Sequence, residues 1–500
     1  MDGAVELCVS LPSGTSTVLS AARCCTIREL KRKVAAEAES SGQVVLTLVA
    51  PDGCVLEEGQ SVEAAGLHDG DTITAIKTQA PQMAATTKRT NLGRVLPMNG
   101  AFATCFPGCN LVVAWGDPEA GGDCSRVQEQ LQNVQQIQAT DGAFAAILAD
   151  GSVVTWGHEW PGGDSRKVQA QLRHVKQIQA TATTFAAIRA DGSVVTWGGA
   201  HHPKDVQDQL RKIHQIQSSH NAFAAIREDG SVVTWGSWIE RYDSEEVRER
   251  LRNVQEIQAT TGAFAAILAD GSVVAWGFSD KGGDCKKVES QLRNVKHIQA
   301  TNAAFAAVLT DGSVVAWGDP AAGGDCREVQ SRLGNVQQIQ ATHFAFAAIL
   351  ADGSVVAWGG PDAGGDCSEV QLQLRNVRQI QATAVAFAAI LADGSVVAWG
   401  DPHGGGDCSQ IQEELRSVQQ VQSTHSAFAA ILEDETVVTW GSSAGGGDCS
   451  GVHGQLRNVK QIQATHAAFA AVLANGSVVT WGEPSSGGDC SQVRDQFGVL

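Results

Sequence analysis

The 500-residue sequence contains only one tyrosine and three methionines, and it has no long uninterrupted apolar run. A transmembrane helix needs about 20 consecutive apolar residues, so we expect no membrane-spanning helix. The N-terminal segment MDGAVELCVSLPSG has no basic stretch followed by an apolar one, which argues against a secretory signal. We therefore expect a cytoplasmic or nuclear protein that does not bind membranes.

Positive charge is also scarce, because 36 lysines and arginines stand against 54 aspartates and glutamates, for a formal net charge of −18. Proteins bind the phosphate backbone of nucleic acids mainly through Lys and Arg, so the composition argues against nucleic-acid binding. The 43% hydrophobic and 18% charged content is typical of a globular protein with a large buried core.

The 13 cysteines include no Cys-x-x-Cys pair, and the spacing nearest to that motif is the Cys-x-x-x-Cys of Cys105 and Cys109. A structural zinc site needs four converging ligands, so we expect no metal site. In the expected reducing compartment the cysteines would remain thiols. The sequence also lacks a Walker-type loop, a Gly-x-Ser-x-Gly motif and a His-Glu-x-x-His motif. We therefore predict no catalytic residues, no cofactor and no enzymatic activity.

Residues 1–77 form a region that does not repeat. VELCVSL and STVLS flank a Pro-Ser-Gly turn and alternate in polarity, which predicts a hairpin. TIRELKRKVAAEAE then places Ile27, Leu30, Val34 and Ala35 on one helical face, with Thr26 as the N-cap. VVLTLVA and DTITAIK are predicted as two further strands, which gives the order ββ-α-ββ.

This order and the segment LEEGQSVEAAGLHDGDTITAI together resemble ubiquitin-like domains. The resemblance implies a β-grasp fold and docking to a ubiquitin receptor, a ligase or the proteasome. The Gly-Gly used for conjugation is missing after ITAIKTQAPQ, so we expect a fixed docking module. The apolar patch by which ubiquitin is bound corresponds here to Pro12, Leu48 and Ile76. The alternative is that Leu48 and Ile76 are core strand residues.

A repeat marked by Trp-Gly occupies residues 90–500, after a predicted flexible linker at residues 78–89. Ten copies follow one another at a spacing of 41 residues, apart from one interval of 38. We align the first, eroded copy from Asn91. The ten tryptophans are Trp115, Trp156, Trp197, Trp235, Trp276, Trp317, Trp358, Trp399, Trp440 and Trp481.

Each unit is predicted to form three short strands, which in residues 253–277 are VQEIQAT, AFAAILA and SVVAWG. The Asp-Gly between the last two is typical of a two-residue type I′ hairpin. That turn would pair Leu268 with Val273 and Ala265 with Trp276, so that a small residue faces the indole. The second and third strands are apolar on both faces, which indicates that neighbouring sheets stack on one another, as in a β-propeller.

The motif [DN]-G-S-V-V-[AT]-W-G, preceded by an I-x-A strand, resembles the repeats of the regulator of chromosome condensation family. The 41-residue length is closer to that of the shorter bacterial relative, beta-lactamase inhibitor protein II. The family's His-Ser in the second strand is replaced by Ala-Phe, as in Ala263-Phe264. Ten units also exceed the number with which that family closes its ring. A single continuous array is favoured by the uniform linkers, but a closed ring, an open spiral and two smaller rings remain alternatives.

Two sets of equivalent residues in the repeat, cysteines and histidines, are of types that could bind a metal or take part in catalysis. The motif Gly-Gly-Asp-Cys places cysteines at Cys124, Cys285, Cys326, Cys367, Cys408, Cys449 and Cys490. Equivalent positions lie one unit apart and do not converge, so we interpret the glycines as a tight turn and the cysteines as small buried residues. His220, His343, His425 and His466 share a position after the first strand, which we interpret as a solvent-facing loop.

The candidate binding residues lie where the repeat becomes irregular. The loops after the third strands of units two, three and four read HEWPGGDS, GAHHPKD and SWIERYDSEE in place of DPAAGGDC. Neighbouring units would project these loops from one edge, and Trp, Tyr and Arg dominate many protein interfaces. The predicted partner-binding residues are Trp160, His201, His202, Trp238, Arg241 and Tyr242. The alternative is that these loops have drifted and that their tryptophans only pack against them.

The sequence thus predicts a mainly β protein, in which a ubiquitin-like β-grasp domain precedes a propeller-type array of ten three-stranded repeats. Our hypothesis is a non-enzymatic adaptor in ubiquitin-linked signalling, whose propeller binds a client protein. One alternative is a component or relative of an E3 ubiquitin-protein ligase whose catalytic module lies elsewhere. Another is guanine-nucleotide exchange, which the altered strand motif and the acidic charge disfavour and which the fold alone does not imply.

Overall fold

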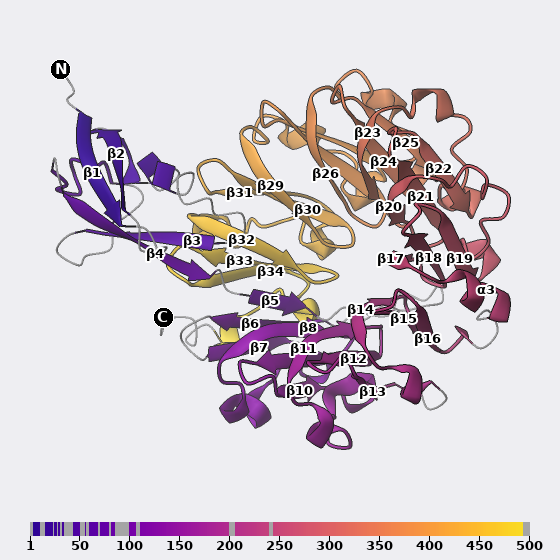
Figure 1. The fold of residues 1–500 in the computed structure, drawn as a ribbon. Coiled ribbons are helices and arrows are strands. Elements are labelled where there is room, and N and C mark those ends of the chain that lie inside the picture. Colours follow the sequence, from indigo (N-terminus) through magenta and orange to yellow (C-terminus); the bar gives the residue numbers. More distant parts are fainter. Residues whose placement is uncertain are drawn as a thin grey trace. The chain divides into compact units, whose positions relative to one another are not determined.

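The computed structural model describes residues 4–10, 16–23, 25–27, 29–30, 33–34, 44–50, 56, 60–68, 71–79, 82–85, 100–106, 111–199, 206–239 and 244–493. The chain divides into two compact units, which are Met1–Gln82 with Phe106–Cys109, and Met83–Cys105 with Asn110–Leu500. Both units are built mainly from β-strands (Figure 1). Among the described residues, no helix is long and apolar enough to cross a membrane.

The first unit is a four-stranded mixed sheet with the strand order β2-β1-β4-β3. Its strands are β1 Ala4–Ser10, β2 Ser16–Ala22, β3 Val44–Val49 and β4 Thr72–Gln79. β1 pairs antiparallel with β2 and parallel with β4, and β3 pairs antiparallel with β4. Helical residues lie between β2 and β3 in the sequence, which gives the β-grasp arrangement expected from the order ββ-α-ββ.

Thr26 caps the helix of this unit as predicted. The Glu29 N–H donates to Thr26 Oγ1 at 3.2 Å, and the Thr26 N–H donates to Glu29 Oε2 at 2.8 Å, which is a reciprocal capping box. Ile27, Leu30 and Val34 are fully buried, and they pack in one core with alternate residues of β1. The capping box therefore fixes the start of a helix whose apolar face covers the sheet.

Of the predicted apolar patch of this unit, Leu48 does not lie on the surface. Leu48 is fully buried in the core that the sheet shares with the helix. Its side chain therefore cannot contribute to a surface patch. Ile76 pairs with Thr47 in the β3–β4 ladder, but its side chain lies outside the described set. Pro12 lies outside the described residues altogether.

The second unit consists of ten three-stranded sheets, the blades, numbered one to ten in chain order. Blade one contains β5 Gln82–Ala85, β6 Ala101–Phe106 and β7 Leu111–Gly116. The first strands of blades two to ten are β8 Val134–Ala139, β11 Val175–Ala180, β14 Ile213–Ser218, β17 Val254–Ala259, β20 Val295–Ala300, β23 Val336–Ala341, β26 Val377–Ala382, β29 Val418–Ser423 and β32 Val459–Ala464.

The other two strands of each blade follow in the sequence. The second strands are β9 Ala143–Leu148, β12 Thr184–Arg189, β15 Ala222–Arg227, β18 Ala263–Leu268, β21 Ala304–Leu309, β24 Ala345–Leu350, β27 Ala386–Leu391, β30 Ala427–Leu432 and β33 Ala468–Leu473. The third strands are β10 Val153–Gly157, β13 Val194–Gly198, β16 Val232–Gly236, β19 Val273–Gly277, β22 Val314–Gly318, β25 Val355–Gly359, β28 Val396–Gly400, β31 Val437–Gly441 and β34 Val478–Gly482.

Short helical turns connect the blades. Those that directly follow third strands are Pro118–Ala120, Glu159–Gly163, Ser279–Lys281, Pro320–Ala322, Pro361–Ala363, Pro402–Gly404, Ser443–Gly445 and Pro484–Ser486. Those that precede first strands, or the end of the described chain, are Ser125–Gln130, Gln169–Gln171, Gln207–Gln209, α3 Glu245–Arg250, Gln330–Arg332, Ser368–Val370, Ser409–Ile411, His453–Gln455 and Ser491–Val493.

Blade one differs from its predicted alignment. Its edge strand is β5, residues 82–85, which lies within the stretch predicted as a linker, whereas the alignment placed that strand from Asn91. The aligned segment NLGRVLPM contains Pro97, which has no N–H to donate to a strand partner.

The hairpin between the second and third strands also differs from the prediction by one residue of register. Ile267 pairs with Val273, and Phe264 pairs with Trp276, because the loop has three residues and not two. The Gly271 N–H donates to Leu268 O at 2.9 Å, and only Gly271 has a positive φ, of 76°. This is a type I turn followed by a left-handed glycine, so the predicted type I′ turn is wrong. As a result the indole faces a phenylalanine and not an alanine.

The aspartates of these hairpins should make the stability of the propeller depend on acid pH. Asp270 Oδ1 accepts hydrogen bonds from the Ser272 hydroxyl at 2.6 Å and the Ser272 N–H at 2.9 Å, and these bonds hold its pKa below the usual 3.8. The same bonds lower the pKa of the equivalent Asp150, Asp191, Asp229, Asp311, Asp352 and Asp393. A lowered pKa in the folded state stabilises the fold above pH 3.8, and this stabilisation is lost as the pH falls through the lower folded values.

We therefore expect the melting temperature to fall between about pH 4 and pH 2. Blade ten shows which substitution suits the control. Its turn has Asn475 in place of the aspartate, and this residue accepts the same two hydrogen bonds from Ser477 but cannot titrate. A variant with asparagine at the seven aspartates should show a smaller fall in melting temperature over that range. An identical fall in both proteins would contradict a contribution from these turns.

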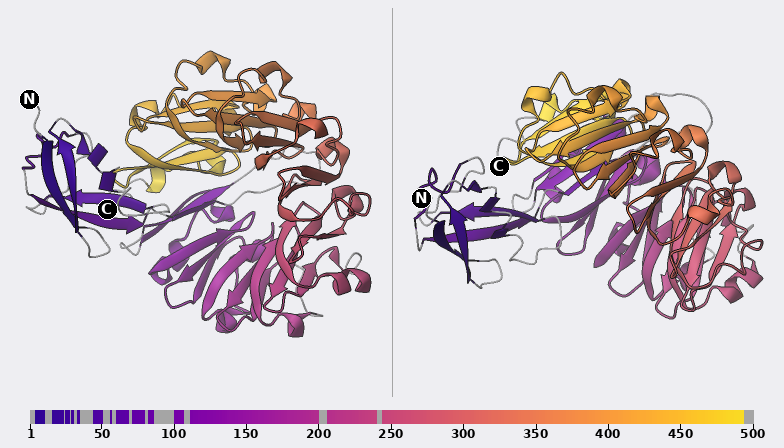
Figure 2. Two further views of the ribbon diagram at one scale, coloured as in Figure 1. Left: turned by 45° about the horizontal axis from the view of Figure 1, so that its top comes forward. Right: turned by 90° about the horizontal axis from the view of Figure 1, so that it is seen from above.

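The blades follow one another around an axis, with the first strands nearest to it (Figures 1 and 2). The turns after the first strands are joined across blades by backbone hydrogen bonds. The His343 N–H donates to Ala384 O at 2.9 Å, the Ala384 N–H to His425 O at 3.0 Å, and the His425 N–H to His466 O at 2.9 Å. The third strands lie farthest from the axis and carry the tryptophans.

The array is closed, which the sequence alone left open. Blade ten lies beside blade one (Figure 1), where the Gly100 N–H donates to Ser485 O at 3.0 Å. The Trp115 indole N–H of blade one donates to Gly487 O at 3.1 Å, after the last strand of blade ten. The same tryptophan–glycine contact joins consecutive blades elsewhere, so the last and first blades meet through an ordinary joint. The second compact unit of the chain is therefore a single ten-bladed β-propeller.

Candidate functional site

The interface between consecutive blades, here called a seam, is held by a recurring contact between an indole and a glycine carbonyl. In blade six the Trp317 Nε1–H donates to Gly282 O at 2.9 Å, and Gly282 lies in the loop that follows blade five. The Trp317 ring stacks on Phe305 at a centroid distance of 5.2 Å. The same indole bond is made by Trp115, Trp156, Trp197, Trp317, Trp358, Trp399, Trp440 and Trp481.

The two glycines of the loop, the Gly-Gly turn, are required by geometry at both positions. Gly323 has a φ of 90°, and a Cβ added to it would lie 2.6 Å from the Phe346 ring of the next blade. A Cβ added to Gly324 would lie 2.5 Å from the Gly318 carbonyl of its own blade. A side chain at either position would therefore collide with its neighbour, which explains why the Gly-Gly turn recurs.

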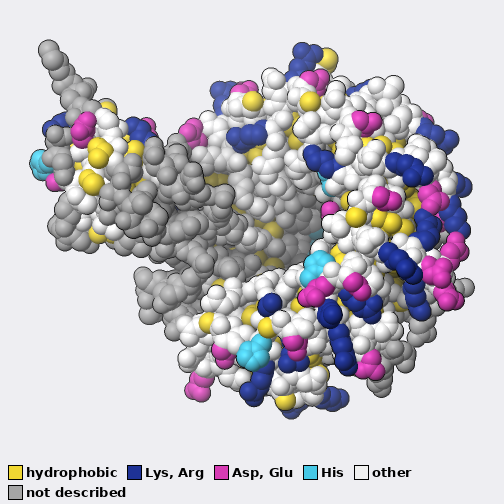
Figure 3. All heavy atoms as spheres, viewed as in Figure 1, with side chains coloured by type: hydrophobic (Ala, Val, Ile, Leu, Met, Phe, Trp, Pro, Cys, Tyr) yellow, Lys and Arg dark blue, Asp and Glu magenta, His cyan; other side chains and the backbone are white. Residues whose placement is uncertain are grey.

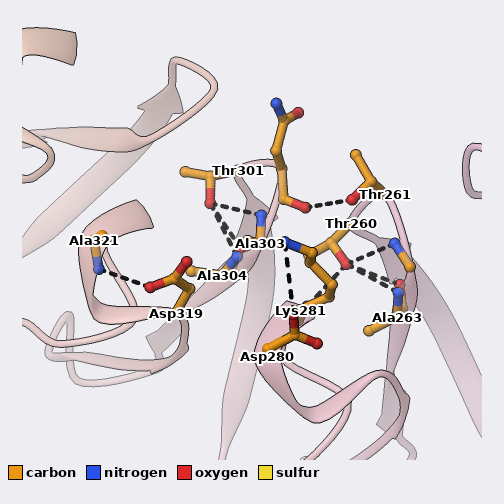
Figure 4. A network of polar contacts seen from close by, with 12 residues as sticks. Thr260, Thr261, Ala263, Asp280, Lys281, Thr301, Ala303, Ala304, Asp319 and Ala321 are labelled. Carbon is orange, nitrogen blue, oxygen red and sulfur yellow. Dashed lines mark hydrogen bonds and ion pairs between the residues drawn. The ribbon is translucent and has the colours of Figure 1, made fainter. Parts of the chain in front are cut away.

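Polar side chains hold this turn in place against the first strand (Figure 4). The Thr260 hydroxyl donates to Lys281 O at 2.9 Å and accepts the Ala263 N–H at 3.0 Å, and Thr301 makes the equivalent bonds in blade six. Asp319 Oδ1 accepts the Ala321 N–H at 3.0 Å at the start of the following turn. The turns after the first strands and the Gly-Gly turns thus lie at the same end of each blade, here called the loop face.

Two neighbouring seams lack the indole bond. Trp235 of blade four and Trp276 of blade five are only 4% and 1% exposed, and their indole N–H groups have no hydrogen-bond partner among the residues that the structure describes. Both rings still stack on their phenylalanine, Phe223 and Phe264, as in the regular blades. Each N–H therefore points toward the place where a Gly-Gly turn lies in the other seams.

The sequence explains why these two seams, here called the open seams, differ. The loop after blade three, GAHHPKD, has no Gly-Gly and is three residues shorter than the regular loop. The loop after blade four has the regular length, but Arg241 and Tyr242 stand at the two glycine positions. In the regular seams a side chain at the first of these positions would collide with the phenylalanine ring, and one at the second with a backbone carbonyl. Blade four is therefore flanked on both sides by a seam without the glycine carbonyl.

Trp238 fills the seam between blades four and five. Its ring lies 5.5 Å from Phe264 and 5.7 Å from Phe278, measured between centroids, and it packs in the same cluster as the buried Ile239. The Phe264 ring is the surface on which a Gly-Gly turn packs in the regular seams. Trp238 is thus a half-buried packing residue in this structure, as the alternative interpretation of the irregular loops anticipated.

Trp160 is exposed, and it is the exposed aromatic residue among the described members of the predicted site. Its side chain is 59% exposed, although its loop keeps the Gly-Gly turn and the regular seam, in which the Trp197 N–H donates to Gly162 O at 3.1 Å. The Trp160 carbonyl accepts the Gly199 N–H of blade three at 2.8 Å, which places Trp160 beside the start of the irregular loop. His201, His202, Arg241 and Tyr242 lie outside the described residues, so the structure assigns them no position.

The cysteines of the repeat are structural. Those at the seven equivalent positions are buried free thiols, and burial raises the thiol pKa of Cys124, Cys285, Cys326, Cys367, Cys408 and Cys449. Cys124 Sγ donates to Gln128 Oε1 at 3.2 Å, and Cys326 makes the same contact with Gln330. A buried thiol with a raised pKa is a poor nucleophile. Within the described part of the chain, no three His, Cys, Asp or Glu residues are placed to hold a metal ion.

The equivalent histidines differ from the predicted solvent-facing loop. His425 stacks on His466 with centroids 4.2 Å apart, and His343 meets His425 edge-on at 5.2 Å. These side chains are half-buried because the backbone bonds between turns bring them together near the axis. On the face shown in Figure 3, which is hollowed at its centre, charged side chains of both signs are interspersed over the propeller. The sequence could not show the histidine contacts, because they depend on how neighbouring blades stack.

The fold can be compared with those of known proteins. No protein-family model and no curated protein matches the chain. Among solved structures, it is similar to Prp20p of Saccharomyces cerevisiae, described with its binding to Gsp1p and histones, at 14% identity over 58% of this chain and 80% of that one, with a TM-score of 0.33. The ectodomain of the Physcomitrella patens receptor kinase CR4 matches at 13% identity over 64% and 73%, with a TM-score of 0.31. Caldiarchaeum subterraneum ubiquitin matches at 21% identity over 16% and 98%, with a TM-score of 0.14.

Proposed function

We propose that this chain is a non-enzymatic interaction adaptor in which the β-grasp unit docks to a protein of the ubiquitin system and the propeller binds a client. The observation that carries the proposal is local: the seams on both sides of blade four lose the regular contact, and the exposed Trp160 is bonded to Gly199 at the start of the first of the two irregular loops. A repeat that is regular in eight seams and irregular in two adjacent ones has a surface unlike the rest of the ring. Aromatic residues at such a surface are typical anchors of protein interfaces.

The client surface is tested by affinity capture with the full chain and with Trp160→Ala. We expect the variant to lose most of the captured client, because an exposed indole at the centre of an interface contributes roughly 2 kcal/mol or more. Leu372→Ala is the matched control, since Leu372 is 80% exposed but lies in the connector between blades seven and eight. Equal capture by both variants would contradict a client surface at these loops. The thermal melts of the two variants show whether either is unfolded.

The docking role of the first unit is tested separately with residues 1–82, which have their own hydrophobic core. We expect this unit to enrich ubiquitin receptors, ligases or proteasome subunits over a propeller-only control. If none is enriched, the ubiquitin part of the proposal fails and the client surface is unaffected. A thioester assay with a charged conjugating enzyme is expected to show no ubiquitin transfer to the seven equivalent cysteines of the propeller, which are buried.

A further inference from the structure

We propose that the loop face of blades six to eight is a second docking surface of the propeller, which binds a basic segment of a partner protein through a large apolar side chain of that segment. The surface, here called the Phe344 patch, consists of Phe344 and Val385 with Asp319, Asp362 and Asp401 around them. The inference goes beyond the client surface proposed above, which lies at the irregular loops after blades two to four on another part of the ring.

Phe344 is the centre of the patch. Its side chain is 44% exposed in the turn after the first strand of blade seven, and its carbonyl accepts the Gly360 N–H at 2.9 Å. Five other blades close this turn with the same backbone bond around a small residue, and their residues at this position are Gly142, Gly262, Ala303, Ser426 and Ala467. The turn therefore forms without an aromatic ring. An exposed aromatic ring that the fold does not need is typical of a contact surface.

Val385 extends the apolar surface into blade eight, where it holds the position equivalent to Phe344. The two turns lie side by side, because the His343 N–H donates to Ala384 O at 2.9 Å. Val385 is half-buried, and a Cβ added to Gly404 of the following loop would lie 2.5 Å from Val385 Cγ2. The apolar part of the patch therefore spans two adjacent blades.

Two loops that adjoin Phe344 carry carboxylates. A Cβ added to Gly360 would lie 3.1 Å from Ala321 O and 3.4 Å from Phe344 Cβ, so Phe344 lies beside the loops that follow blades six and seven. Asp319 begins the first of these loops, and Asp362 is exposed in the second. Each loop therefore brings a negative charge next to the aromatic ring.

A third carboxylate adjoins Val385. The Asp401 N–H donates to Val385 O at 3.0 Å at the start of the loop after blade eight. Up to their recurring Gly-Gly-Asp, the loops after blades six, seven and eight contain no lysine or arginine. Arg327, which follows the first of them, pairs with Asp325. An apolar centre surrounded by negative charge is complementary to a segment that carries lysine or arginine beside a large apolar side chain.

A random peptide library displayed on phage is the probe for a test on the full-length protein, with counter-selection on Phe344→Ala. This variant should keep its fold, since Ala303 and Ala467 stand at the same position, and a thermal melt checks it. We expect the enriched peptides to carry lysine or arginine on both sides of a large apolar residue. Enriched peptides without basic residues, or a failure to enrich any peptide that distinguishes the two proteins, would overturn the inference.

The affinity of an enriched peptide, measured by fluorescence anisotropy, should depend on both parts of the patch. We expect Phe344→Ala to bind the peptide at least about tenfold more weakly, because the apolar anchor is lost. Asp362→Asn should weaken binding about two- to fivefold, because it removes one of the surrounding charges. Added salt should weaken binding to the wild-type protein, because it screens the same attraction.

The chain supplies a matched control for the charge. Asp352→Asn removes one negative charge from the other end of blade seven, and Asn475 forms the same turn in blade ten. This variant should bind the peptide like the wild-type protein. Equal losses in Asp362→Asn and Asp352→Asn would mean that net charge alone attracts the peptide, which would contradict the Phe344 patch. Trp160→Ala should also leave peptide binding unchanged, so the client surface and the Phe344 patch can fail separately.

Discussion

Gly487→Ala is expected to destabilise the propeller by about 2–5 kcal/mol. A left-handed conformation costs an alanine about 1–2 kcal/mol, and crowding a packed site costs about 1–3 kcal/mol more. Gly487 has a φ of 89°, and its added Cβ would lie 2.6 Å from the Phe102 ring of blade one. Urea unfolding can be followed by tryptophan fluorescence, because all 12 tryptophans lie in the propeller and none in the first unit.

Two matched variants turn this measurement into a test of ring closure. Gly364→Ala introduces the same clash, 2.6 Å from Phe387, at a seam inside the array. Gly334→Ala adds a Cβ with nothing within 4 Å and should be neutral or slightly stabilising. A closed ring predicts similar losses for Gly487→Ala and Gly364→Ala. A loss in Gly364→Ala alone would mean that the last and first blades do not meet in solution.

Trp317→Phe is expected to cost about 1–3 kcal/mol more than Trp276→Phe. Both substitutions remove a similar volume from a buried ring that stacks on phenylalanine, at centroid distances of 5.2 and 5.4 Å. Trp317→Phe leaves the buried Gly282 carbonyl without its indole donor, whereas Trp276→Phe removes a donor that has no partner among the described residues. The difference between the two variants therefore isolates the hydrogen bond from the loss of packing.

The comparison needs the two proteins to be measured by the same unfolding transition. Urea midpoints with an unchanged slope, and the thermal melts, provide that check. Equal destabilisation in the two variants would show that the indole bond contributes nothing to the seam. A larger loss in Trp276→Phe would mean that its N–H has an acceptor in solution, which would remove the basis for calling that seam open.

Much of the fold could be predicted because the same sequence pattern occurs ten times. The period of the Trp-Gly dipeptide and the two-faced apolar strands were sufficient to predict stacked three-stranded sheets. In the first unit, Thr26 and Glu29 carry a capping signature that depends only on local sequence, so the helix start was also predictable. These are cases in which local chemistry and global packing agree.

The hairpin register could not be predicted as reliably, because Asp-Gly occurs both in two-residue turns and in three-residue turns with a left-handed glycine. The second kind is used here, and it places Phe264 opposite Trp276. The stacked pair and the indole bond both follow from that one-residue difference. A prediction that missed the register therefore also missed the contact that holds the seams.

The candidate site was located by its irregular loops, but its physical character was not visible in the sequence. Trp160 and Trp238 had equal standing there, whereas the structure exposes the first and packs the second on Phe264. The unpaired indoles of Trp235 and Trp276 were missed, although a signal was present. Each follows a loop without Gly-Gly, and that absence marks the seam that lacks a carbonyl.

Ring closure through an ordinary seam has an evolutionary consequence. Each joint is formed by the loop of one repeat and the hairpin of the next, and the joint between Gly487 and Trp115 is no exception. Duplication or loss of one 41-residue unit would therefore regenerate the same joint wherever it occurred, and only the curvature of the ring would change. The number of blades can therefore change during evolution while a single pair of loops diverges in sequence, because each blade contacts only its two neighbours.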